Sequence, residues 1–416
     1  MHICVFEDQY YSNLLPLVYL RPVYELRSGI NNLLLNITGQ IKKLPLILTV
    51  RSYLKDIVST YKSDILINSF PDDDILFLNG RLLRIDGLKS IIKNLNSDCI
   101  LYINDDIAGF YCKRKSLNDV KRCITDGIVN SSLLKNYKEK KCSGKMIRYS
   151  WDLIHNSYDE IEIQFREISK KISRSVKKYK GAYIINSKNV AISSNAEIKP
   201  GVVLDAEKGP IVIGQNVIIM PNAVIQGPVY IGRNSIIKAG AVIYPGTSIG
   251  EYSKIGGEIE CSIVQSYSNK QHSGYLGHSY LGSWVNIGAD TNTSDLKNNY
   301  SNVRVYVNGS MIDSGKQFVG LTMGDHSKSG INVMFDTGSV VGISCNIYGA
   351  GLPPKFIPSF SWGSGSTYTE YDVNKSIETM KKVMARRQVE MRPEYVQIIK
   401  HIFTETIHER QKAGVV

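Results

Sequence analysis

A period of six residues runs through the second half of the chain. It is neither the 3.6-residue period of an α-helix nor the simple alternation of a flat strand. The period is typical of a parallel β-helix, in which three six-residue units complete one coil and each aliphatic side chain stacks on those of the neighbouring coils. A β-sandwich would instead show turn signals about every eight to twelve residues. The recurring aliphatic residues, on either side of a short insertion, are Ile192, Ile198, Leu204, Ile213, Ile219, Ile225, Ile231, Ile237, Ile243, Ile249 and Ile255.

Interruptions of the repeat have patterns of their own. The period fades after Gly256 and resumes by Phe335. Within the gap, residues 303–312 alternate in strand fashion around an Asn-Gly pair, which favours a hairpin. Beyond the repeats, residues 373–387 and 394–410 have a helical pattern, and we expect these helices to cap or flank the end of the solenoid.

The first part of the chain is organised differently. Short apolar runs at 3–6, 46–50, 75–78 and 99–103 alternate with amphipathic stretches. This alternation predicts an α/β, Rossmann-like domain with a mostly parallel sheet. A charged stretch then favours a linking helix. The predicted division is an α/β domain at 1–157, a linking helix at 158–180, a β-helix at 181–365 and C-terminal helices at 366–416.

Composition limits the class of protein. The chain has 416 residues, of which 43% are hydrophobic, enough for two sizeable cores. It has no apolar run of membrane-spanning length and no signal peptide, so we expect a cytoplasmic protein that does not bind membranes. Seven scattered cysteines, none in a Cys-x-x-Cys pair, predict neither disulfides nor a zinc site. The net charge of +12 suits phosphorylated substrates, and the scarcity of aromatic residues among the basic ones disfavours nucleic acid.

His272 lies in an interruption of the repeat, and this position makes it a candidate for chemistry. Joining an amine to the carbonyl carbon of a thioester requires a base that takes the proton of the amine. Histidine suits this step because its imidazole changes charge near neutral pH. A lone histidine is more often structural, however, and by position His278 and His326 are no better candidates.

The residues around His272 carry a resemblance to a known family. Residues 272–277 read His-Ser-Gly-Tyr-Leu-Gly, and residues 285–291 read Val-Asn-Ile-Gly-Ala-Asp-Thr. With their spacing, they resemble the His-x-x-Tyr-x-Gly and Val-Asn-Ile-Gly-Ala-Gly-Thr signature of the glucosamine-1-phosphate N-acetyltransferase domain. That domain belongs to the bifunctional enzyme that makes UDP-N-acetylglucosamine. The resemblance implies a left-handed parallel β-helix, a homotrimer, and clefts between subunits where acetyl-CoA meets the sugar phosphate.

The resemblance also implies roles for single residues. His272 would be the general base, Tyr275 would hold the sugar phosphate and Asn286 would contact the amino sugar. Without the family match, Tyr275 and Asn286 would be a packed aromatic residue and a stacked corner asparagine. Asn299 and Tyr300 resemble, at a displaced position, an Asn-Tyr pair of the sugar site. The implied contacts to acetyl-CoA are Gly288, Ala289 and Lys328.

One departure from the family concerns the phosphate. The family binds it with Arg and Lys side chains in the coil before the histidine, where this chain has Glu258 and Glu260. Either Lys254 or Lys270 contacts the phosphate instead, or the acceptor is a different amino sugar. Further candidates for the phosphates of CoA are Lys355, Arg386 and Arg387.

Residues 14–27 resemble the segment after the phosphate loop of sugar-1-phosphate nucleotidyltransferases. The Gly-rich loop that would cradle phosphates is missing, and residues 7–13 offer acidic and bulky side chains in its place. Where the family has a metal-binding aspartate, this chain has Arg81, two residues after Asn79, and an arginine cannot ligate Mg²⁺. The domain is therefore either inactive, or it holds phosphates through Arg21, Arg27 and Arg81, with Asn79 beside them.

The leading hypothesis is acetyl transfer from acetyl-CoA to the amine of glucosamine 1-phosphate. Uridylyl transfer from UTP to N-acetylglucosamine 1-phosphate, with Mg²⁺, is the second activity to consider, and both steps serve UDP-N-acetylglucosamine biosynthesis. The alternatives are a different acceptor sugar, a nucleotidyltransferase alone, and a non-catalytic trimeric scaffold.

Overall fold

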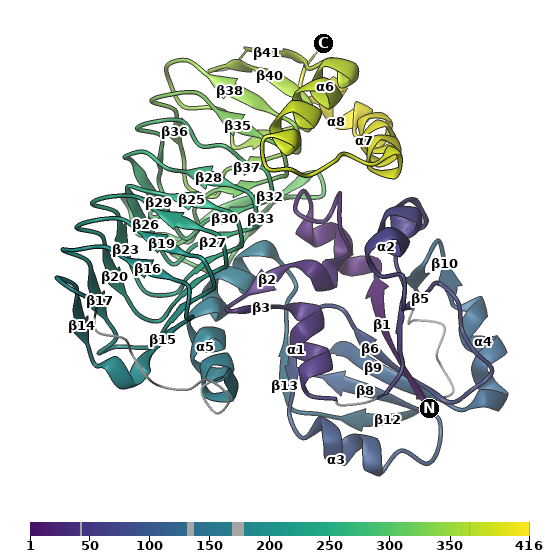
Figure 1. Cartoon of the computed structure of the whole chain (residues 1–416). Coiled ribbons are helices and arrows are strands. Elements are labelled where there is room, and N and C mark those ends of the chain that lie inside the picture. Colours follow the sequence, from purple (N-terminus) through teal and green to yellow (C-terminus); the bar gives the residue numbers. More distant parts are fainter. Residues whose placement is uncertain (42–43, 131–136, 169–178, 366, 416) are drawn as a thin grey trace.

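The structure is a computed structural model of the chain and describes residues 1–41, 44–130, 137–168, 179–365 and 367–415. Figure 1 shows an N-terminal α/β domain beside a long β-helix, with the C-terminal helices next to the last coils. The predicted fold class, an α/β nucleotidyltransferase-like domain followed by a left-handed parallel β-helix with C-terminal helices, is confirmed.

The N-terminal domain is built on a mixed, mostly parallel sheet. The central strand β1 (His2–Asp8) pairs in parallel with β4 (Leu46–Leu48), β6 (Ile75–Asn79) and β11 (Ile128–Val129). Separate apolar clusters fill the two faces of the sheet, as expected where both faces are covered. The other strands of the domain are β2 (Arg27–Ser28), β3 (Asn31–Asn32), β5 (Leu66–Ile67), β7 (Leu82–Ile85), β8 (Cys99–Ile103), β9 (Asp106–Cys112), β10 (Ile124–Thr125), β12 (Lys138–Lys141) and β13 (Gly144–Met146).

The carboxyl end of β1 runs into a short 3-10 helix, η1 (Gln9–Leu14), in place of a Gly-rich loop. The Asp8 side chain caps this helix by accepting a hydrogen bond from the backbone N–H of Tyr10 at 3.2 Å. The helices of the domain are α1 (Leu33–Gly39), α2 (Lys55–Tyr61), α3 (Leu88–Lys93) and α4 (Leu117–Arg122).

Helix α5 (Ser150–Ile168) joins the two domains and begins earlier than the linking helix predicted from residue 158. It starts early because Trp151 is buried against valines of the 303–312 hairpin and the next coils. Its later residues Ile161 and Phe165 are buried against the β-helix. The remainder of the predicted linking helix, at 169–178, lies outside the described residues.

The β-helix has three faces, each a parallel sheet that gains one strand per coil. The first face comprises β14 (Tyr183–Ile185), β17 (Val203–Asp205), β20 (Val224–Gln226), β23 (Val242–Ile243), β26 (Glu258–Glu260) and β29 (Tyr275–Gly277), followed by β31 (Asn292–Thr293) and β36 (Met334–Phe335). The second comprises β15 (Val190–Ile192), β18 (Ile211–Ile213), β21 (Val229–Ile231), β24 (Thr247–Ile249), β27 (Ile263–Val264), β30 (Tyr280–Leu281), β34 (Thr322–Met323), β37 (Val340–Val341) and β39 (Phe356–Ile357). The third comprises β16 (Glu197–Ile198), β19 (Ile218–Ile219), β22 (Ile236–Ile237), β25 (Lys254–Ile255) and β28 (Asn269–Lys270), and continues in β35 (Lys328–Ser329), β38 (Asn346–Tyr348) and β40 (Ser361–Ser364). A last strand, β41 (Thr367–Glu370), pairs with β40 in antiparallel fashion.

The aliphatic residues of the six-residue period form the core of the β-helix. From Leu204 to Ile255 they point inward and are at most 1% exposed. The predicted hairpin is confirmed as β32 (Arg304–Val307) and β33 (Ser310–Asp313). Its turn residues Asn308 and Gly309 both have positive φ angles, of 47° and 86°.

The predicted C-terminal helices are confirmed as α6 (Val373–Ala385), α7 (Pro393–Glu405) and α8 (Ile407–Lys412). Their position was only partly foreseen, because they flank the β-helix and also contact the N-terminal domain. Ile399 and Ile402 of α7 share one buried cluster with Leu54 and Val58. Figure 1 shows α7 facing α2. Among the described residues, no helix has both the length and the apolar character needed to cross a membrane.

Candidate functional site

His272 lies in the loop between β28 and β29, where the β-helix turns from its third face to its first. The imidazole is exposed and has no hydrogen-bond partner among the described residues. The loop itself is held firmly, because the Lys270 ammonium donates to the carbonyl oxygens of His272 (2.6 Å) and Ser273 (2.9 Å). Gly274, with φ 105°, packs so closely that an added Cβ would lie 2.2 Å from the carbonyl oxygen of Thr291. The loop thus presents a free imidazole on a fixed backbone.

Lys270 has a different place from the one predicted for a sugar-phosphate contact. It occupies the inward position of the row that contains Ile237 and Ile255, and it is only 1% exposed. Burial lowers the pKa of its ammonium to about 8. Its charge is used inside the β-helix to hold the loop, so it does not reach a phosphate at the surface.

An acidic cluster occupies the first face beside this loop. The Tyr275 hydroxyl lies 2.8 Å from a carboxylate oxygen of Glu260 and 3.1 Å from one of Asp295. Asp295 also lies 2.7 Å from Nδ1 of His278. Burial opposes a charge on His278, but its hydrogen bonds, of which that to Asp295 is the strongest, raise its pKa to about 9. At neutral pH His278 is therefore protonated, and it offers no free base.

A ladder of polar side chains runs up the third face. Lys254 pairs with Asn269, and Asn286 forms bridges to Asn269 on one side and Lys328 on the other. The amide of Asn269 donates to the carbonyl oxygen of the Asn286 side chain at 3.4 Å and accepts from the Arg387 guanidinium at 2.9 Å. Asn286 is thus tied to Asn269 and, through it, to the C-terminal end of α6.

The other predicted contacts of the β-helix are dispersed. Gly288 and Ala289 form the corner after Asn286, and a Cβ at Gly288 would lie 2.0 Å from the carbonyl oxygen of Gly330. Lys328 lies at the top of the ladder, where its ammonium donates to the carbonyl oxygen of His326 at 2.9 Å. Asn299 and Tyr300 lie in an exposed turn and make no hydrogen bond to the His272 loop in the described part of the chain.

The predicted nucleotide residues Asn79 and Arg81 meet at the carboxyl edge of the N-terminal sheet. Arg81 is 1% exposed and donates to both oxygens of Asp8, at 3.0 Å from Nε and 2.7 Å from Nη2, and to the carbonyl oxygen of Ile147 at 2.7 Å. Its Nη2 also lies 3.4 Å from Asp106. Asn79 donates to Asp8 at 2.8 Å. Glu7, next along β1, is buried in an ion pair with Arg51 at 3.2 Å.

This arrangement does not fit Mg²⁺. The carboxylates that could bind the ion, Asp8 and Asp106, already share the guanidinium of Arg81, and a divalent cation would have to displace it. Within the described ranges, no group of three or more His, Cys, Asp or Glu residues is arranged to hold a metal ion. The two acidic residues of the 7–13 segment, Glu7 and Asp8, form ion pairs with Arg51 and Arg81.

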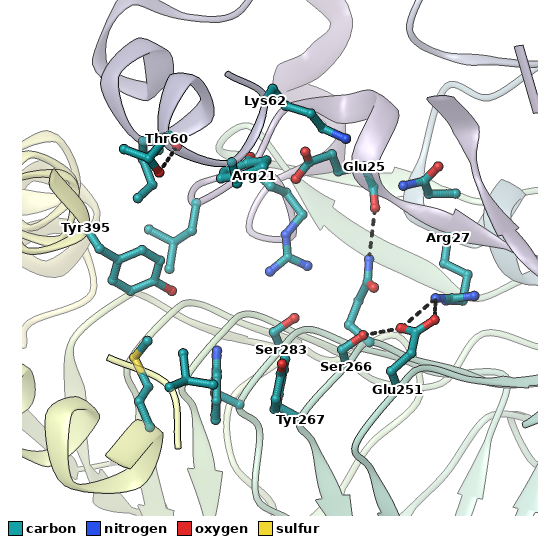
Figure 2. A pocket seen from close by; sticks show the side chains of 18 of the residues that line it. Arg21, Glu25, Arg27, Thr60, Lys62, Glu251, Ser266, Tyr267, Ser283 and Tyr395 are labelled. Atoms are coloured by element: carbon teal, nitrogen blue, oxygen red, sulfur yellow. Dashed lines mark hydrogen bonds and ion pairs between the residues drawn. The ribbon is translucent and has the colours of Figure 1, made fainter. Parts of the chain in front are cut away.

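A pocket of about 860 Å³ lies between the two domains and is closed on one side by the segment around α7. Figure 2 shows Arg21, Glu25 and Lys62 facing the β-helix residues Ser283 and Tyr267 across it. This pocket contains the other two predicted nucleotide residues, Arg21 and Arg27, but not Asn79 or Arg81.

Arg21 and Arg27 are both paired with carboxylates of the β-helix. Arg21 bonds to Asp325, and Arg27 Nη2 donates to the two oxygens of Glu251 at 2.9 and 3.0 Å. These pairs join the two domains and balance the charges of Arg21 and Arg27. Lys62, Arg233 and Arg392 also line the pocket and form no salt bridge within the described residues. The two ion pairs were not predictable from the sequence, because the paired residues are more than two hundred positions apart.

The residues missed by sequence reasoning are Asp295 and Asn269, besides the pairing of Tyr275 with Glu260. A signal was available for some of them. Residues 15 to 18 positions apart in regular coils stack on one another, as Lys254 does on Asn269 and Ile236 on Lys254. Extending this register through the interruption at His272 would have placed Glu260 beside Gly277, next to Tyr275.

Comparison with known proteins adds the family context. Residues 3–173 match the family model described as sugar nucleotidyl transferase, and residues 210–245 match that of the bacterial transferase hexapeptide with six repeats. The chain is 37% identical over 143 residues to the bifunctional sugar-1-phosphate nucleotidylyltransferase/acetyltransferase of Sulfurisphaera tokodaii, which covers 34% of this chain and 36% of that relative. It is 24% identical over 340 residues to the bifunctional protein GlmU of Methanocaldococcus jannaschii. This alignment covers 73% of this chain and 78% of that relative.

A third similarity concerns the acetyltransferase YaiX, of uncharacterised activity, from Escherichia coli O6:K15:H31. The chain is 33% identical to it over 171 residues, which are 41% of this chain and 74% of that relative. The alignments therefore span about a third of the first relative and about three quarters of the other two.

Proposed function

Because this chain belongs to the family of sugar nucleotidyltransferases joined to hexapeptide-repeat acetyltransferases, we propose that it transfers the acetyl group of acetyl-CoA to the amine of glucosamine 1-phosphate. The observation that carries the proposal is the His272 loop, whose backbone is fixed by Lys270 and Gly274 while the imidazole remains free.

In the proposed reaction the amine nitrogen attacks the carbonyl carbon of the thioester. His272 takes the proton that the nitrogen loses as the amide forms, and the C–S bond breaks. The thiolate of CoA then takes this proton from the imidazolium and leaves as the thiol. Tyr275 and Asn286 flank His272 on the first and third faces, and we assign them to holding the sugar. The fixed loop backbone limits the geometries available to the imidazole, and positioning of this kind accelerates a reaction between two bound substrates.

The same geometry supports a homotrimer. Tyr275 and Asn286 point outward from different faces, and His272 lies at the corner between them. One β-helix is convex at such a corner, so a single chain cannot enclose a substrate there. A neighbouring subunit would complete the site. A cytoplasmic location, expected from the sequence, stays a prediction.

Uridylyl transfer from UTP to N-acetylglucosamine 1-phosphate is the second candidate function, and with acetyl transfer it would make UDP-N-acetylglucosamine. It is favoured by the match of residues 3–173 to the sugar nucleotidyl transferase model. The burial of Arg81 between Asp8 and Asp106 argues against the Mg²⁺-dependent form of this reaction.

The test of acetyl transfer is to incubate the full chain with acetyl-CoA and glucosamine 1-phosphate and to follow free thiol. A parallel reaction with UTP, Mg²⁺ and N-acetylglucosamine 1-phosphate follows pyrophosphate. We expect thiol release, and we expect His272→Ala to lower its rate by about 100-fold or more because the general base is lost.

The matched control is His408→Ala, which removes an exposed histidine of α8 far along the chain. It should release thiol at the wild-type rate. Full activity of His272→Ala would refute the assignment of the base, and absence of thiol release with the wild-type chain would refute the proposed reaction.

A further inference from the structure

Four cationic side chains gather on the third face of the β-helix and at the end of α6. They are Lys238, Lys254, Arg386 and Arg387, here called the basic cluster. None of them forms an ion pair with a carboxylate in the part of the chain that the structure describes. By contrast, Lys199, in the same row as Lys238, is paired with Glu197 at 2.6 Å.

The cluster is held in place by the fold. Lys254 is the outward residue of β25, and Asn269 stacks on it in the next coil. Arg387 donates to the side-chain oxygen of that asparagine at 2.9 Å, which fixes the guanidinium over the ladder. Lys238 lies one coil below Gly256. A Cβ added to Gly256 would lie 3.1 Å from the Cβ of this lysine. Two different parts of the chain thus contribute to one positively charged surface.

The charges of the cluster oppose one another. Burial lowers the pKa of Lys254, and the positive charges of Arg387, Lys238 and Arg386 lower it further. Burial and Arg386 likewise lower the pKa of Arg387. No carboxylate contributes to either shift. Cations brought together without a counter-ion destabilise the folded chain unless an anion joins them.

We propose that the basic cluster binds a phosphate group of one of the two substrates. Its place relative to the reactive histidine fits this role. Lys238, Gly256 and Gln271 occupy successive coils of one row, and Gln271 precedes His272. Two coil spacings amount to roughly 10 Å. The inference rests on the proposed acetyl transfer, and it supplies the phosphate contact that Glu258, Glu260 and the buried Lys270 do not provide.

The first experiment measures anion binding and does not depend on enzymatic activity. The melting temperature of the full chain is measured with inorganic pyrophosphate and, at equal ionic strength, with sodium chloride. We expect pyrophosphate to raise it more than chloride does, because the anion relieves the repulsion. In the double variant Lys254→Ala/Arg387→Ala the pyrophosphate effect should be lost, whereas Lys199→Ala should retain it.

The second experiment identifies the substrate that supplies the phosphate. The KM of wild type and double variant is measured for acetyl-CoA and acetyl-3′-dephospho-CoA, and for glucosamine 1-phosphate and glucosamine. Loss of contacts to a charged phosphate should raise the KM of the substrate that carries it by about tenfold or more. The KM of the matching dephosphorylated compound should change little. A rise for acetyl-CoA or for glucosamine 1-phosphate supports the proposal and names the source.

Two outcomes would overturn the proposal. One is an equal response of wild type and double variant to pyrophosphate together with unchanged KM values, while thiol release shows that the acetyltransferase is active. The other is dissociation of oligomers in the double variant with no change in the pyrophosphate effect, which would assign the cluster to carboxylates of a second copy. If the wild-type chain released no thiol, the pyrophosphate measurement would still decide whether the cluster binds anions.

Discussion

Arg81 carries a full positive charge at a site that is 1% exposed, and two carboxylates balance it. The guanidinium fills the space between Asp8 and Asp106 and, through Ile147, ties the carboxyl edge of the N-terminal sheet to the segment before α5. A side chain that is part of the protein thus occupies the place that a cation would otherwise take at this edge. The charges of these carboxylates are balanced by Arg81 without a metal ion.

The role of Arg81 in balancing Asp8 and Asp106 can be tested through stability. Removing one member of a buried ion pair leaves an uncompensated charge, so Arg81→Ala should lower the free energy of unfolding by about 3–5 kcal/mol. Because the variant opens a space beside two carboxylates, millimolar Mn²⁺ should restore part of the loss. Denaturant unfolding with and without Mn²⁺ measures both effects.

Wild type should show no such response to Mn²⁺. The control Arg114→Ala removes an arginine whose pair with Asp72 is exposed to solvent, and it should change stability little. Specific stabilisation of the wild-type chain by Mn²⁺ would contradict the interpretation of Arg81.

The His272 loop is an element whose shape depends on one glycine. Gly274 has φ 105°, and the space that a side chain would need is taken by Thr291. Gly274→Ala should therefore displace the loop and lower kcat for acetyl transfer by about tenfold or more, since small misplacements of a catalytic group are costly. Steady-state kinetics beside a thermal unfolding curve would separate this effect from loss of the fold.

A second glycine at the same corner of the β-helix serves as control. Gly240 also has a positive φ, of 67°, but its missing Cβ would meet nothing within 4 Å. Gly240→Ala should cost some stability and leave kcat unchanged. Equal losses of kcat in both variants would show that strain anywhere along this corner, and not the His272 loop, controls the rate.

The elements of the β-helix were predictable from sequence because each inward isoleucine must stack on the next. The burial of Lys270 was not predictable, because a lysine fills an inward position of the same row. Its hydrogen bonds to the carbonyl oxygens of His272 and Ser273 offset the cost of burying the ammonium. His272 was singled out by its place in an interruption of the repeat, and Tyr275 and Asn286 by the resemblance to the family signature; the roles of all three stay predictions. Asp295 was missed because the register linking it to Tyr275 passes through an interruption.

At the level of the whole molecule, ion pairs between the domains make their contact sensitive to acid. Burial alone would raise the pKa of Glu251, but the charge of Arg27 and the Ser266 hydroxyl lower it to about 2. A carboxylate with a depressed pKa stabilises the fold above its ordinary pKa near 4.5, and this contribution disappears as the pH falls toward 2. The loss amounts to about 3 kcal/mol.

The measurement is the free energy of unfolding between pH 6 and 2 for wild type and Glu251→Gln. The variant should be less stable than wild type at pH 6, and the two should converge toward pH 2, where Glu251 is protonated. A constant difference across this range would show that Glu251 and Arg27 do not couple the domains in solution.

The contact of α7 with the N-terminal domain has a consequence for how such a chain can evolve. Ile399 and Ile402 share their buried cluster with Leu54 and Val58, so a gene that lost its first half would leave these isoleucines in water. Selection therefore acts against loss of the N-terminal domain, whatever activity its sheet edge carries.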